Sequence, residues 1–154
     1  MNIGVVGNPR YADLQAILRL LADVAPKLGI TLYTDEGLEQ LWPKAPAPIA
    51  HAKLDALITL GGDGTLLRGA RLLAGKETPI LGVNLGRVGF LTSASRESFT
   101  VAIEALAAGR HAIERRQVLH AVIRGADGSE RSRTHALNDV VSIKEASPAW
   151  YASA

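Results

Sequence analysis

A glycine-rich turn between a strand pattern and a helix pattern constrains this chain more than any other feature. The run Leu60-Gly61-Gly62-Asp63-Gly64-Thr65 follows the apolar residues 57–60 and precedes residues 66–74, whose periodicity predicts a helix. Glycines allow positive φ and let a ligand approach the backbone closely. A helix start offers unpaired N–H groups and a positive dipole end to an anion. The turn therefore indicates a phosphate-binding loop.

One carboxylate, Asp63, lies inside this anion-binding loop. A negative charge there weakens phosphate binding, so its presence favours a role in proton transfer or metal binding. The alternative is that Asp63 only caps the following helix while the glycines form a tight turn. The residues alone leave both interpretations open.

Strand and helix patterns alternate from the N-terminus to about residue 112. Strands are predicted at 3–6, 30–33, 54–60 and 79–84, and helices at 12–28, 66–74 and 98–109. This alternation predicts a parallel sheet covered on both faces. We therefore expect an α/β domain over residues 1–112.

The pattern changes after residue 113. Residues 118–123 and 134–144 are predicted strands, and Gly125-Ala126-Asp127-Gly128-Ser129 between them is a hairpin signal. A two-stranded hairpin is only marginally stable alone. We therefore expect residues 113–154 to be the incomplete start of a β-rich second domain.

Composition excludes several classes of partner. The 154 residues carry a formal net charge of only +2, without the Lys/Arg run of a nucleic-acid-binding surface. No stretch approaches the roughly 20 apolar residues of a membrane span. We expect neither nucleic acid nor membrane as a partner. The absence of cysteine agrees with a cytoplasmic location. The four histidines lack metal-ligand spacing, so no metal ligand is assigned.

Four other positions are candidates for ligand contact. Phe90, in the glycine-rich block 82–92, either stacks on a base or anchors its loop in the core. Asn138 and Asp139 interrupt an apolar run, so they either face solvent or bind the diol of a ribose. Arg68, one turn into the predicted helix, either binds phosphate or lies exposed.

Three segments, taken together, resemble the NAD kinase family. They are Gly61-Gly62-Asp63-Gly64-Thr65-Leu66-Leu67-Arg68, then Gly82-Val83-Asn84-Leu85-Gly86-Arg87-Val88-Gly89-Phe90-Leu91-Thr92, then Leu137-Asn138-Asp139-Val140-Val141. The glycine loop is also similar to those of diacylglycerol kinases and 6-phosphofructokinases. The second segment distinguishes NAD kinases from these relatives.

The resemblance implies a kinase that transfers the γ-phosphoryl of ATP to the 2′-hydroxyl of the adenosine ribose of NAD, giving NADP. It implies Mg²⁺ or another divalent cation, with ATP as the donor. Asp63 would be the general base. The implied NAD-binding residues are Asp63, Gly64, Arg68, Phe90, Asn138 and Asp139, and the implied phosphate-binding residues are Gly61, Gly62, Gly64 and Thr65.

The chain also departs from the family pattern. Family members continue into a large β domain with a Thr-Pro-Thr-Gly-Ser-Thr-Ala-Tyr segment, which completes the dinucleotide pocket and helps to build a homo-oligomer. Nothing similar follows Val141 here. We therefore expect a truncated chain that is feebly active or inactive. The alternatives are a non-catalytic nucleotide-binding module and a relative of the lipid kinases.

Overall fold

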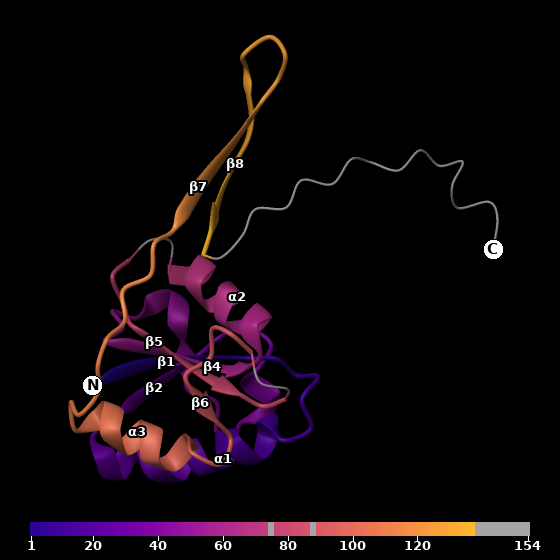
Figure 1. Ribbon diagram of the computed structural model, residues 1–154. Coiled ribbons are helices and arrows are strands. Elements are labelled where there is room, and N and C mark those ends of the chain that lie inside the picture. Colours follow the sequence, from indigo (N-terminus) through magenta and orange to yellow (C-terminus); the bar gives the residue numbers. More distant parts are fainter. Residues whose placement is uncertain (74–75, 87–88, 138–154) are drawn as a thin grey trace, which may run out of the picture. The chain divides into compact units, whose positions relative to one another are not determined.

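The computed structural model describes residues 1–73, 76–86 and 89–137. Its contacts divide the chain into two compact units, Met1–Ile113 and Glu114–Ala154 (Figure 1). No helix in the described ranges is long and apolar enough to cross a membrane.

A six-stranded, wholly parallel sheet forms the centre of the first unit, with the strand order β3-β2-β1-β4-β5-β6. The strands are β1 (Asn2–Gly7), β2 (Thr31–Thr34), β3 (Ala47–Pro48), β4 (Ala56–Gly61), β5 (Ile80–Asn84) and β6 (Ala94–Ser95). The helices are α1 (Leu14–Val24), α2 (Asp63–Leu73) and α3 (Phe99–Ala107), with short 3₁₀ turns η1 (Ala25–Leu28), η2 (Glu39–Leu41) and η3 (Ile49–His51). The predicted α/β fold with a parallel sheet is confirmed.

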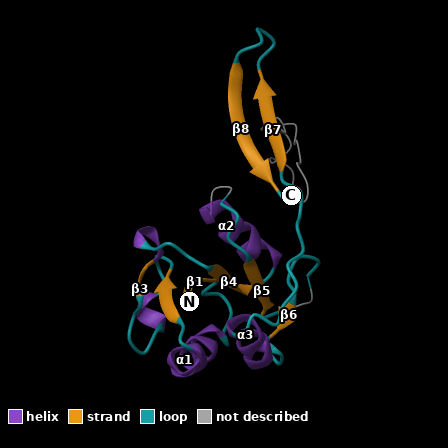
Figure 2. Ribbon diagram, turned by 90° about the vertical axis from the view of Figure 1, so that its left-hand side faces the viewer, coloured by secondary structure: helices purple, strands orange, loops and turns teal. Residues whose placement is uncertain are grey.

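Helices cover both faces of this sheet. In Figures 1 and 2, α1 and α3 lie on one face and α2 on the other. Successive strand residues point to opposite faces, so Val5 joins the larger core cluster with Phe99, whereas Val6 packs with Leu57 and Leu73 in a smaller cluster. Burial on both faces explains why the central strands are apolar without interruption.

Two helix boundaries differ from the sequence prediction by three residues or more. The helix expected over 12–28 ends as an α-helix at Val24 and continues as the 3₁₀ turn η1, since Pro26 has no N–H for an α-helical bond. The chain then turns at Gly29, whose φ is 66°. Helix α2 begins at Asp63 rather than at residue 66, because the N–H of Leu66 already donates to Gly62 O at 3.2 Å.

The second unit contains an antiparallel hairpin of β7 (Leu119–Arg124) and β8 (Glu130–Ala136). The predicted turn over 125–129 is confirmed, with the N–H of Gly125 donating to Ser129 O at 2.8 Å. The expectation that the second strand begins at residue 134 is wrong, because this tight turn lets pairing start at Glu130. Residues 138–144 of that predicted strand lie outside the described residues.

Candidate functional site

A cleft of about 540 Å³ opens where the loops after β1 and β4 meet the start of α2. The N–H of Asn8, just after β1, donates to Leu60 O of β4 at 3.0 Å and holds the two strand ends together. The lining residues are Gly7, Asn8, Pro9, Arg10, Tyr11, Gly62, Asp63, Gly64, Thr65 and Arg68. Ligands of open α/β sheets bind at this edge, outside the carboxyl ends of the strands.

The glycine loop contributes the floor of this cleft. Of the four residues expected to bind phosphate, Gly62, Gly64 and Thr65 line the cleft, while Gly61 ends β4 and is buried. A Cβ on Gly61 would overlap the Thr65 side chain, whereas a Cβ on Gly64 would meet no atom within 4 Å. None of the three glycines has positive φ. Glycine is therefore needed at position 61 because of close packing, and at position 64 it leaves the backbone open to the cleft. Neither position requires a left-handed turn.

Asp63 bonds to a second loop instead of capping its own helix. Its Oδ2 accepts the N–H of Phe90 at 2.9 Å, and its Oδ1 accepts the N–H of Leu91 at 3.1 Å. The neighbouring Gly89 has no space for a Cβ, which would overlap the Asp63 carboxylate. A carboxylate has about four acceptor positions, so Asp63 binds this loop and keeps acceptor capacity for the cleft that it lines.

The second loop, which follows β5, is fastened to the glycine loop at both ends. At its start, the N–H of Leu85 donates to Gly61 O at 3.0 Å, and the Asn84 side chain accepts the N–H of Gly86 at 2.8 Å. At its far end it is held by Asp63. Phe90 itself is 94% exposed, so the interpretation that it anchors the loop in the core is wrong.

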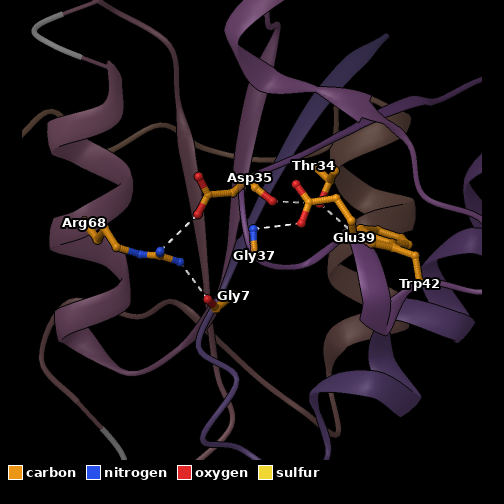
Figure 3. Close-up of polar contacts among 7 residues, drawn as sticks. All are labelled: Gly7, Thr34, Asp35, Gly37, Glu39, Trp42 and Arg68. Carbon is orange, nitrogen blue, oxygen red and sulfur yellow. Dashed lines mark hydrogen bonds and ion pairs between the residues drawn. The ribbon is translucent and has the colours of Figure 1, made fainter.

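Arg68 reaches from α2 to the ends of two neighbouring strands (Figure 3). Its guanidinium donates to Gly7 O at 2.6 Å and pairs with Asp35 Oδ2 at 3.0 Å. Asp35, which directly follows β2, was not predicted from the sequence. On the far side of Asp35, the indole N–H of Trp42 donates to Thr34 Oγ1 at 2.8 Å. Arg68 thus ties α2 to the sheet while still lining the cleft.

Tyr11 is a second residue of the cleft that was not predicted from the sequence. Its hydroxyl lies 3.2 Å from the position of a Cβ on Gly62, and its Cε1 lies 2.8 Å from that of a Cβ on Gly86. The ring therefore contacts both glycine-rich loops and lines the cleft. The chain did hold a signal for Tyr11. Gly7-Asn8-Pro9 ends a strand that runs parallel to β4, so the residues after it reach the same edge of the sheet.

The described residues contain no group of three or more His, Cys, Asp and Glu side chains that could hold a metal ion. Protein sites that use Mg²⁺ with ATP commonly supply only one or two carboxylates, and the substrate phosphates and water complete the coordination. Asp63 is the one carboxylate among the described residues that line the cleft. Asn138 and Asp139 lie outside the described residues.

The fold and the cleft define an open α/β domain with a glycine-rich loop that lines a cleft at the carboxyl edge of its sheet. Residues 3–111 match the family described as the ATP-NAD kinase N-terminal domain. The chain belongs to the NAD kinase family.

Individual relatives agree with this assignment. The NAD kinase of Gemmatimonas aurantiaca is 48% identical over 144 residues, which cover 94% of this chain and 50% of that protein. The NAD kinase of Heliobacterium modesticaldum is 48% identical over 150 residues, covering 92% and 51%. The chain thus spans about half the length of these curated relatives.

A solved structure supports the fold. The yeast NADH kinase complexed with NADH superposes with a TM-score of 0.71 at 20% sequence identity, covering 90% of this chain and 44% of that one. At this identity the likeness is one of fold.

Proposed function

We propose that this chain carries the donor-binding and base-bearing part of an NAD kinase, which transfers the γ-phosphoryl of ATP to the 2′-hydroxyl of the adenosine ribose of NAD. One observation carries the proposal: Asp63 lines a cleft built from a glycine-rich loop, and its carboxylate also holds the loop of Phe90. The base and a residue suited to stacking on adenine are thereby linked.

In the proposed reaction, Asp63 takes the proton of the 2′-hydroxyl. The ribose oxygen forms a bond to the γ-phosphorus as the bond to the β–γ bridging oxygen breaks, and ADP leaves with that electron pair. The acceptor positions of Asp63 that the loop does not use would receive the proton. A positioned general base contributes about 10²–10⁴-fold to such a rate.

The glycine loop would hold the phosphates. Gly62, Gly64 and Thr65 lie at the start of α2, where backbone N–H groups and the helix dipole favour negative charge. Gly61 supports this loop from the end of β4. Arg68 adds positive charge to the same cleft. Its guanidinium has five N–H donors, so binding to Gly7 and Asp35 leaves donors for the dinucleotide.

The remaining parts of the proposal follow from family membership. Mg²⁺, when bound with ATP, would neutralise phosphate charge. Phe90 would line the adenine pocket, and Asn138 and Asp139 would bind NAD. We further propose residues 1–112 as the nucleotide-binding domain, residues 113–154 as the start of the β domain, a cytoplasmic location, and a homo-oligomer for the complete protein.

Incubation of the purified chain with ATP, Mg²⁺ and NAD⁺ tests the proposal, with detection by a dehydrogenase that accepts only NADP. Product that this dehydrogenase reduces supports transfer to the 2′ position. The Asp63→Asn variant belongs beside the parent. The NH₂ group of asparagine cannot accept an N–H from the loop, so this variant loses a hydrogen bond as well as the base. The chemical unfolding of the variant and its affinity for NAD⁺ must therefore be measured as well.

A second candidate is a nucleotide-binding module without catalysis. It is favoured by the two backbone N–H groups that already occupy the carboxylate of Asp63. The two candidates differ in one result. The module binds nucleotide but gives no NADP from either protein, whereas the kinase gives product that depends on Asp63.

A further inference from the structure

The Tyr11 hydroxyl is a polar group in the cleft that the family motifs do not explain. It lies beside Gly62 and 3.3 Å from the position of a Cβ on Gly86. The ring is half-buried and packs against the larger core cluster. Within residues 1–73, 76–86 and 89–137, no protein group forms a hydrogen bond with this hydroxyl. Tyrosine hydroxyls usually have a hydrogen-bond partner where they meet protein surface, and Tyr11 lines the cleft, so a molecule bound there can supply that partner.

The surroundings of the hydroxyl favour an anion. The same cleft contains Arg10 and Arg68, as well as the backbone of Gly64 at the start of α2. Thr65 is only 5% exposed, yet it also lines the cleft. Two arginines and the open backbone at a helix start are features of a phosphate site, and in this cleft they outnumber the single carboxylate, Asp63.

We infer that the Tyr11 hydroxyl donates a hydrogen bond to a phosphate group of the nucleotide bound over Gly62–Thr65. Tyr11 is then a ligand-contacting residue, and its ring places the hydroxyl by packing between the glycine loop and Gly86. This inference rests on the proposed function only in taking ATP as the nucleotide. A neutral phenol is well suited to the contact, because it donates a hydrogen bond without adding charge beside Asp63.

The test is calorimetric binding of Mg²⁺-ATP and of inorganic tripolyphosphate to the 154-residue chain. The variant is Tyr11→Phe, which removes only the hydroxyl and keeps the ring between the loops. The matched control is Tyr33→Phe, which removes the same group from a tyrosine of β2 that does not line the cleft. Chemical unfolding of all three proteins checks that the fold is retained.

We expect Tyr11→Phe to lower the affinity for both ligands by about 10- to 100-fold, as for a lost hydrogen bond to a charged group. Tyr33→Phe should change neither affinity. Unchanged affinities in Tyr11→Phe would overturn the inference and leave the proposed function standing. A loss confined to ATP would also overturn it, because the contact would then be to the nucleoside. A folded parent that binds neither ligand would overturn both.

Discussion

The Asp63 carboxylate and Gly89 lie so close that no side chain fits on the glycine. This contact brings the N–H groups of Phe90 and Leu91 onto the two carboxylate oxygens. The residue proposed as the base is therefore also the residue that fixes the loop carrying Phe90. Substitutions at Asp63 consequently change two properties together, and Gly89 offers a way to separate them.

Gly89→Ala should displace the loop while leaving the Asp63 carboxylate chemically intact. We expect the Phe90 and Leu91 amides to exchange with solvent markedly faster, and the free energy of unfolding to fall by about 1–3 kcal/mol through overpacking. Hydrogen exchange and chemical denaturation measure these effects. Gly64→Ala is the control, because its Cβ would meet no atom. Equal protection of both amides in Gly89→Ala and the parent would show that the contact does not position the loop.

Thr59→Val should stabilise the first unit. Thr59 lies on β4, is 1% exposed, and has a buried hydroxyl without a hydrogen-bond partner in the described part of the chain. An unpaired buried polar group costs about 1–3 kcal/mol, and valine has nearly the same shape. We expect a gain of about 1 kcal/mol in urea unfolding, whereas Thr31→Val at an exposed position of β2 should change little. A loss of stability in Thr59→Val would argue against this account.

The Arg68–Asp35 ion pair should contribute a small but measurable coupling energy. The Asp35 side chain is only 15% exposed, although that of Arg68 is 50% exposed. A double-mutant cycle with Arg68→Ala and Asp35→Ala should give about 0.5–1 kcal/mol at low salt, decreasing as salt is added. The side chains of the Arg96–Asp13 pair are 52% and 42% exposed, so this pair should give a smaller coupling energy. Coupling that is absent for the first pair, or larger for the second, would contradict the prediction.

The stability of the hairpin in the second unit should depend on pH through Asp127 in its turn. The hydroxyl of Ser129 donates to Asp127 Oδ1 at 2.6 Å and, with the Ser129 N–H, holds the pKa of Asp127 below its usual value. A lowered folded-state pKa stabilises the hairpin above the unfolded-state pKa, and this stabilisation is lost as pH falls through the folded-state pKa. Ser129→Ala should raise the pKa of Asp127 in an NMR titration, while Ser132→Ala should leave it unchanged. An unshifted titration in Ser129→Ala would contradict the assignment.

The sequence predicted the features that depend on local pattern. Apolar strands that alternate with helices identified the parallel sheet, and the strand–glycine–helix order placed Asp63 and Thr65 at its carboxyl edge. The expected end of the first helical segment at residue 28 agrees with the left-handed backbone at Gly29, whose φ is 66°. These inferences required only the chain's own periodicity and turn chemistry.

Contacts between distant loops could not be predicted in the same way. Asp63 had several plausible partners in sequence, and only the folded chain shows that it accepts N–H groups 27 and 28 residues away. Tyr11 and Asp35 carry no motif. They enter the site because β1, β2 and β4 are neighbours in the sheet. The strand order therefore supplied the information that the linear pattern lacked.

The most direct test of the proposed function is the initial rate of NADP⁺ formation by the parent chain and by Asp63→Asn at saturating ATP, Mg²⁺ and NAD⁺. An assay that accumulates product over hours is sensitive enough for a feebly active protein. We predict a slow rate for the parent and one at least about 100-fold lower for the variant. Equal rates would contradict Asp63 as the base of an NAD kinase, whereas no product from a folded parent that binds both nucleotides would favour the non-catalytic module.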